Sequence, residues 1–196
     1  MDAEAILHEL TQAEGLPRKA LEAASARRVE MLPLFLAEIE AYLALEPAAR
    51  VKPTPLFFIF HLLGEWREKA AYRLLARLLR VPGPEIDAIF GDGITSTSHR
   101  VMAAVFDGHP EPLCEIFLDP HAEQFVRSRM FEALAMGYAE RRTRSGTGNP
   151  YPPRRVHGDP ATSAEFCLVR LAERYCDARI GRAKNSGEEG FRSRLY

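Results

Sequence analysis

Aspartate and histidine recur close together in the middle of the chain, and these residue types could hold a metal ion. Imidazole and carboxylate groups bind divalent transition metals, so converging loops would give the centre of a metal-dependent hydrolase. An Asp or His near a proline at a helix start more often caps the helix, and the sequence favours that interpretation. The residues concerned are Asp92, His99, Asp107, His109, Asp119 and His121.

Three other patterns begin a motif without completing it. His8 and Glu9 start the H-E-x-x-H zinc motif, but Gln12 stands where the second imidazole is required. Residues 95–99 place hydroxyl groups beside an imidazole, although adjacency does not produce the geometry of a nucleophile and its base. Residues 91–93 lack the preceding strand and further glycines of a phosphate-binding loop. The sequence therefore predicts no catalytic residue, no cofactor and no stoichiometric metal.

One predicted surface combines positive charge with an aromatic side chain. Over residues 68–80, three arginines recur at spacings of four and three, opposite a stripe of leucines. Such a row could bind an acidic protein or peptide, with a neighbouring tryptophan as an anchor. The alternative is a solvated helix face whose charge Glu65 and Glu68 balance. The candidate partner-binding surface consists of Trp66, Arg67, Arg73, Arg77 and Arg80.

The elements that must position these side chains are helices. Apolar residues recur at spacings of three and four throughout residues 1–137, and no period-two alternation bounded by turn residues predicts a sheet. Pro33 falls inside a periodic run, which predicts a kink or a helix start there. Prolines suited to a first helical turn are Pro17, Pro55, Pro84, Pro110 and Pro120. Loops are expected at residues 14–17, 46–54, 80–84, 91–97, 107–110 and 118–121.

The expected architecture is all-α, with at least six helices packed as antiparallel pairs. Three apolar segments end at or near Gly64, Gly108 and Gly137, and successive units lie about 30 to 45 residues apart, as in HEAT-like repeats. Stacking of such pairs predicts a short α-solenoid. The side chains expected to be buried are Leu36, Ile39, Phe58, Leu62, Leu74, Leu78, Val101, Val105 and Phe131.

Four segments of the chain closely resemble an uncharacterised family of bacterial proteins of unknown function, with HEAT-like helical repeats. They are residues 34–42, 53–67, 98–106 and 126–134. The resemblance covers nearly all of residues 1–137 and implies no established activity. Some longer relatives resemble proteins with a small Cys-rich zinc-binding motif at the C-terminus, and no such motif stands in this sequence.

The composition changes at about Gly137, which divides the chain into a helical-repeat domain (1–137) and a tail rich in Arg, Gly and Pro (138–196). Lys and Arg number 14 against 20 Asp and Glu in the first part, and 12 against 7 in the second, so net charges of −6 and +5 give the total of −1. We interpret the tail as the product of a frameshift near Gly137. The alternative is a genuine tail, with a loop at residues 141–160 and an amphipathic helix at 163–182.

Overall composition excludes several classes of function. The chain is 46% hydrophobic and 27% charged, as in soluble globular proteins, and its net charge of −1 argues against nucleic acid or an anionic membrane surface. The longest apolar run, residues 56–63, is shorter than the roughly 20 residues of a membrane-spanning helix. An acidic N-terminus without a signal sequence predicts a cytoplasmic protein. The three cysteines, without C-x-x-C spacing, fit a reducing compartment and indicate buried apolar side chains.

These observations predict a non-enzymatic module that binds a protein or peptide, because solenoids present extended surfaces and no catalytic set is complete. The alternative is a metal-dependent hydrolase built from the His and Asp loop residues. If the tail is out of frame, the face of helix 121–136 that carries Phe125, Met130 and Leu134 should be incompletely buried. Self-association through that uncapped C-terminal end is then expected.

Overall fold

The computed structural model describes residues 1–50 and 53–145, with side chains through Gly137. Every regular element in this part of the chain is helical, which confirms the all-α prediction. The elements are α1 (Ala3–Gln12), α2 (Arg18–Ala26), α3 (Arg28–Ala44), η1 (Pro47–Ala49), α4 (Leu56–Glu65), η2 (Lys69–Ala71), α5 (Tyr72–Leu78), α6 (Gly83–Phe90), α7 (Gly93–Ser96), α8 (Ser98–Val105), α9 (Glu111–Leu118) and α10 (Gln124–Ser145). None of the helices described is long and apolar enough to cross a membrane.

Helix starts follow the expected proline chemistry in most places. Pro17, Pro55 and Pro110 directly precede α2, α4 and α9, where a missing N–H costs nothing. The expected start at Pro120 is wrong, because α10 begins at Gln124 and Glu123 caps it by accepting from the Val126 N–H at 2.8 Å. Pro33 lies within α3, which continues through it.

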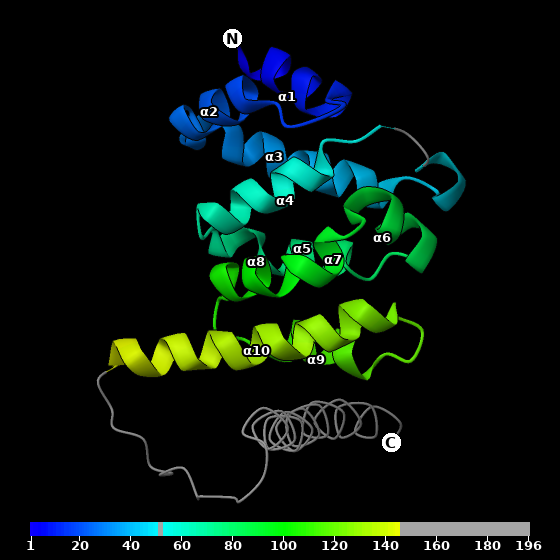
Figure 1. Ribbon diagram of the computed structural model, residues 1–196, viewed down its shortest axis with the longest axis vertical. Coiled ribbons are helices and arrows are strands. Elements are labelled where there is room, and N and C mark those ends of the chain that lie inside the picture. The colour runs from blue at the N-terminus through cyan, green and yellow to red at the C-terminus, as the bar shows by residue number, and fades with distance from the viewer. Residues whose placement is uncertain (51–52, 146–196) are drawn as a thin grey trace, which may run out of the picture.

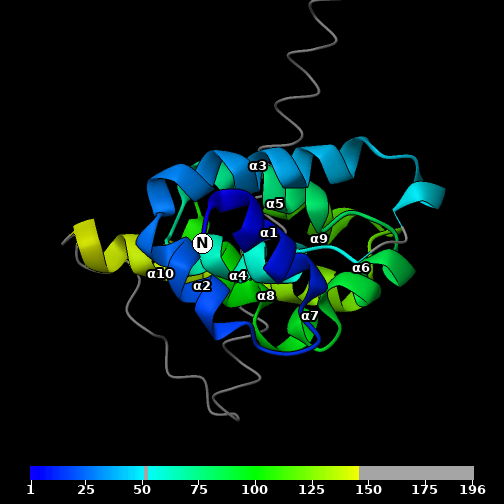
Figure 2. The ribbon, with the colours of Figure 1, turned by 90° about the horizontal axis from the view of Figure 1, so that it is seen from above.

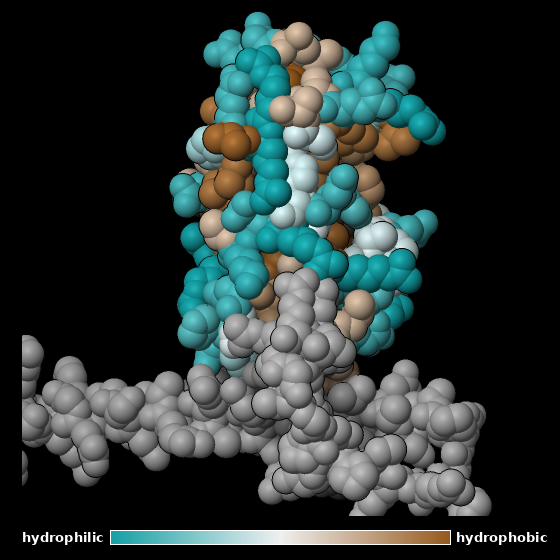
Figure 3. Space-filling view, turned by 90° about the vertical axis from the view of Figure 1, so that its left-hand side faces the viewer, coloured by the Kyte–Doolittle hydropathy of each residue, from teal (hydrophilic) through white to brown (hydrophobic). Residues whose placement is uncertain are grey.

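Seven of the helices described lie in two rows. The first row is α2, α4, α8 and α10, and the second is α3, α5 and α9; within each row every helix contacts the next. Chain order alternates between the rows, with α6 and α7 inserted between α5 and α8, while α1 packs on α2. Figure 1 shows the resulting stack of helices, and Figure 2 shows α3 and α5 on one side with α4 and α8 on the other. Figure 3 shows one face of the stack, on which hydrophobic residues are scattered among hydrophilic ones.

A continuous apolar core runs between the rows from Ile6 in α1 to Leu134 in α10. Burial of apolar surface is the main favourable term in folding, and here it joins each helix to its neighbours in both rows. Of the nine side chains predicted to be buried, six are. Leu36, Phe58 and Phe131 are only half-buried, because each lies at the margin of the core.

Two glycines allow the first-row helices to approach closely. A Cβ added at Gly64 in α4 would lie 2.9 Å from both methyl groups of Val101 in α8. A Cβ added at Gly137 in α10 would lie 2.7 Å from Cδ1 of Phe106, the residue that follows α8. Real Cβ atoms essentially never approach other atoms this closely, so both positions require glycine for packing.

Gly137 therefore does not end a helix, and the break expected there is wrong as a structural boundary. Helix α10 continues to Ser145, so residues 141–145 are helical where a loop was expected. Met130 and Leu134 are buried against the rest of the molecule, whereas Phe125 is 52% exposed. The remainder of the expected loop and the expected helix at 163–182 lie outside the described residues.

Candidate functional site

The arginine row lies on the outer face of α5 and the turn that follows it. Arg73 and Arg77 project from α5 and Arg80 lies just beyond it, all exposed, because Leu74 and Leu78 occupy the buried side of the helix. This alternation is what the apolar period predicts.

Downstream loops place carboxylates beside two of these arginines. The Tyr72 hydroxyl donates to the His109 carbonyl oxygen at 2.9 Å, and this bond holds the loop with Asp107 beside Arg73. The Asp107 carboxylate lies 3.7 Å from the Arg73 guanidinium, whose side chain is 64% exposed. A pair this exposed contributes little to stability.

Arg80 has two acidic partners. Its guanidinium lies 3.0 Å from Glu115 in α9 and 3.5 Å from Asp119 at the end of α9. The His121 backbone N–H, which donates to Asp119, lowers the pKa of that carboxyl, and the Arg80 charge acts in the same direction. The expectation that Glu65 and Glu68 balance the row is wrong for Glu68, because it pairs with Arg28 at 3.1 Å.

Arg77 differs from its neighbours. It is exposed in the middle of the row and forms no ion pair with any described residue. Its positive charge is therefore the one charge of the row that the described part of the chain leaves unbalanced.

Trp66 does not belong to the exposed surface, which corrects the expected aromatic anchor. Its side chain is 8% exposed and stacks on Phe35 of α3, with ring centroids 5.5 Å apart and planes 9° apart. The Arg28 guanidinium carbon lies 5.7 Å from the centre of its ring, a cation–π contact. Trp66 thus joins α4 to α3 inside the core.

Arg67 is exposed and has a backbone φ of 53°. Its N–H donates to the Gly64 carbonyl and the Glu68 N–H donates to the Leu63 carbonyl, both at 3.0 Å. These two bonds form a Schellman motif, in which the residue at this position is usually glycine. An arginine here has a conformational cost that its side chain must offset elsewhere.

The residues proposed as metal ligands form turns instead. The carboxylates of Asp107 and Asp119 accept from the backbone N–H groups of His109 and His121, at 2.7 and 2.9 Å. Both imidazoles point away into exposed positions. Within residues 1–50 and 53–145, no three His, Cys, Asp or Glu side chains converge as metal ligands. On α1, His8 is exposed in an open depression.

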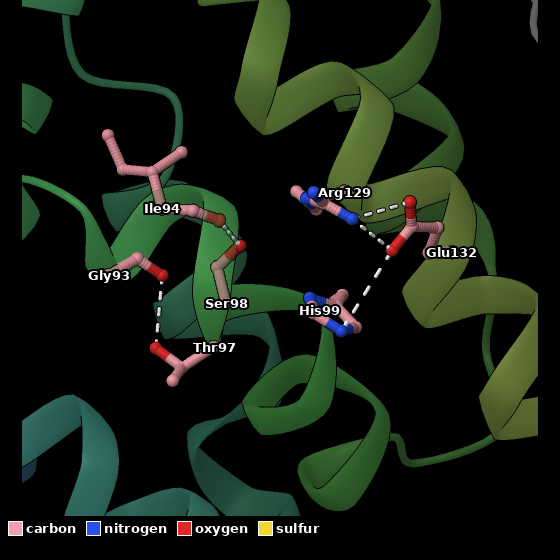
Figure 4. Close-up of polar contacts among 7 residues, drawn as sticks. All are labelled: Gly93, Ile94, Thr97, Ser98, His99, Arg129 and Glu132. Atoms are coloured by element: carbon pink, nitrogen blue, oxygen red, sulfur yellow. Dashed lines mark hydrogen bonds and ion pairs between the residues drawn. The ribbon is translucent and has the colours of Figure 1, made fainter.

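The hydroxyl groups of residues 95–99 mainly bond helix carbonyls. Ser98 donates to the Ile94 carbonyl, and Thr97 donates to the Gly93 carbonyl at 3.0 Å (Figure 4). Thr97 Oγ1 also lies 2.8 Å from Nε2 of His61, whose Nδ1 donates to the Phe57 carbonyl. The pair has the spacing of a nucleophile and its base, but the single Thr97 hydroxyl proton is donated to the Gly93 carbonyl.

Two polar clusters had no sequence signal. Arg50 donates to the carbonyls of Leu43 and Leu45 and pairs with Glu85 at 3.3 Å, at a pocket of about 420 Å³ lined also by Tyr42. Burial, with the nearby Glu85 charge, raises the pKa of Tyr42. The second cluster joins His99 of α8 to Glu132 and Arg129 of α10. Both depend on residues more than 30 positions apart, which sequence spacing does not reveal.

This geometry defines an all-helical protein with no assembled catalytic centre among its described residues. The chain belongs to a family described as "Protein of unknown function (DUF1186)", whose sequence pattern matches residues 1–145. The resemblance to an uncharacterised bacterial family is thereby confirmed, and the match continues past Gly137.

A distant relative comes from a bacterium. An uncharacterized protein of Chlamydia trachomatis serovar D is 27% identical over 139 residues, which cover 68% of this chain and 54% of that protein. The chain therefore spans about half the length of this curated relative. No solved structure is significantly similar to the chain.

Proposed function

We propose that the protein is a non-enzymatic helical-repeat module that binds another protein or a peptide. The alternation of successive helices between two rows supports a HEAT-like arrangement of stacked pairs, that is, a short α-solenoid. Proteins built from such stacked helix pairs present extended surfaces that bind a partner. We also propose a cytoplasmic location and no binding of nucleic acid or membrane, from the charge and composition of the chain.

The proposed binding surface is the face of α5 with Arg67, Arg73, Arg77 and Arg80. The observation that carries this proposal is the exposed Arg77, which has no ion pair with the described residues while both neighbouring arginines are paired. An acidic side chain of a partner would complete the alternation of charge along the row. Since Arg73 and Asp107 are 3.7 Å apart and exposed, their pair can open at little cost to admit such a partner.

Charge reversal tests the surface. A photo-crosslinking residue placed at Arg73 in the full chain, produced in its natural host, should capture a specific partner. Arg77→Glu should abolish that crosslink through charge repulsion. Arg18→Glu is the matched control, because Arg18 is an exposed arginine on α2 that also lacks an ion pair with the described residues. Equal loss with both variants, or none with Arg77→Glu, would contradict the proposal.

The outer face of the last two helices is proposed as a surface for self-association. Three large apolar side chains on or beside α9 and α10 are exposed: Leu118 (40%), Phe125 (52%) and Met136 (43%). Exposed apolar surface favours association. Sedimentation velocity should show a concentration-dependent dimer that Phe125→Ser weakens, whereas a monomer at all concentrations would exclude it.

We retain the proposal that the tail is a frameshift product. The family match to residue 145 supports a shift near or beyond that codon more than one at Gly137. The nucleotide sequence of the gene, read in all frames past codon 137, tests it directly. A shifted frame without continued similarity to the family would exclude the frameshift.

A further inference from the structure

His99 occupies an unusual position between α8 and α10. It projects from α8 toward α10, and its side chain is only 12% exposed (Figure 4). Nε2 lies 3.9 Å from the Glu132 carboxylate, while Nδ1 is buried without a hydrogen-bond partner among the described residues. Buried polar atoms nearly always have a partner, so this nitrogen calls for a physical explanation.

The Glu132 carboxylate near His99 is already paired with an arginine. Both oxygens of Glu132 lie 2.6 Å from Nη1 of Arg129, on the same helix. The other charged group that acts on His99 is Arg100, its neighbour on α8. From the other helices packed on α8, namely α4, α5, η2 and α7, no described charged side chain lies within ion-pair distance of the imidazole.

The two protonation states of His99 differ in what they leave unpaired. In the neutral ring with the proton on Nε2, toward Glu132, the buried Nδ1 is an acceptor whose lone pair meets no donor among the described residues. In the imidazolium, Nδ1 becomes a buried N–H donor without an acceptor and the ring adds a desolvated charge. Burial accordingly lowers the pKa of His99, and the partial attraction of Glu132 opposes this.

We propose that His99 is an acid-sensitive latch that keeps α10 docked on α8 while neutral and releases it when protonated. Because the His99 side chain is only 12% exposed, protonation places a charge and an unmatched N–H donor between these helices. Protonation therefore weakens the contact between these helices, whereas the contact of α4 with α8 at Gly64 and Val101 is apolar and does not involve His99. The device gives the end of the first row a response to mild acid.

Hydrogen exchange of the full chain, followed from about pH 8 to about pH 5, tests the latch across the range in which histidine titrates. After correction for intrinsic exchange rates, opening of α10 should increase several-fold on acidification, while opening of α4 changes little. His99→Gln should remove the dependence because glutamine does not titrate. His121→Gln, at an exposed histidine, is the matched control and should retain it.

A second variant keeps the proposal testable if His99→Gln does not fold. Glu132→Gln removes the carboxylate that lies 3.9 Å from the imidazole, so the acid transition of α10 should move to lower pH. The NMR titration of the His99 ring should move with it. An acid transition that is unchanged in His99→Gln, or a His99 titration that Glu132→Gln does not move, would overturn the proposal.

Discussion

Helix α8 makes two close contacts that look alike in the backbone and differ in chemistry. On one side Gly64 of α4 meets Val101, and on the other Gly137 of α10 meets Phe106. The first contact is surrounded by apolar core side chains, whereas the pair of helices that makes the second also carries a polar cluster of His99, Glu132 and Arg129 (Figure 4). The comparison teaches that glycine sets how closely two helices pack, while the side chains around it decide which conditions separate them.

The largest effect should follow from filling the apolar contact. Gly64→Ala places a methyl group 2.9 Å from both branches of Val101, whose β-branched side chain has little freedom to move. We expect a loss of about 2 kcal/mol in the free energy of unfolding by overpacking, despite the better helix propensity of alanine. Urea unfolding measures it. Gly15→Ala, where an added Cβ meets nothing within 4 Å, is the control and should cost far less.

Filling the second contact should cost somewhat less. Gly137→Ala brings a methyl group to 2.7 Å from the edge of the Phe106 ring, which lies just after α8. Phenylalanine has two side-chain torsions through which it can move aside, whereas Val101 has one. The expected loss is about 1 to 2 kcal/mol, with faster amide exchange in α10 than in α4. Phe106→Leu should partly restore stability in the double variant. A loss as large as that of Gly64→Ala, spread over all helices, would show that the two contacts form one unit.

The pH dependence of stability should separate the two contacts. Because the pKa of folded His99 lies below its unfolded value, the unfolded chain takes up the proton first as the pH falls. The stability from neutral His99 is complete above the unfolded pKa of about 6.5 and is lost as the pH falls from there to the lower folded value. Urea unfolding at several pH values should show a flatter profile for His99→Gln than for Gly64→Ala, and parallel profiles would refute this assignment.

The smallest expected change is a gain at the end of α4. Arg67→Gly relieves the left-handed backbone conformation and should stabilise the chain by about 1 kcal/mol or less. Thermal unfolding measures the gain, and the α10 exchange rates should not change. If the variant is instead destabilised, the Arg67 side chain contributes more to the fold than its backbone costs. Arg67→Ala, which keeps the backbone cost and removes the side chain, distinguishes the two contributions.

Local periodicity predicted the fold better than the surfaces. The helix over α5 and the burial of Leu74 and Leu78 follow from spacing alone, because a helix with one apolar stripe has one way to face the core. The helix end expected at Gly137 is wrong, because a glycine in a sequence is equally typical of a helix end and of a close helix crossing. The choice between them depends on Phe106, which only the folded chain brings into contact.

The candidate site was predicted less completely for the same physical reason. The exposure of Arg77 follows from its position opposite the leucines, but the partners of Arg80 come from α9 and the loop after it, far along the chain. Trp66 was placed on the surface because the sequence does not show that Phe35 stacks on its ring. Pairings between distant segments decide which side chains remain available, and single-sequence spacing contains no information on them.

The insertion of α6 and α7 in the chain between α5 and α8 affects the expected order of folding. Helices α1 to α5 and helices α8 to α10 each make contacts with near neighbours in sequence, and such local contacts form quickly. The contact of α4 with α8 must instead close a loop that contains both inserted helices, which adds chain entropy to that step. We therefore expect two local folding nuclei that join late. Val101→Ala, at the contact of α4 with α8, should accordingly speed unfolding more than it slows refolding.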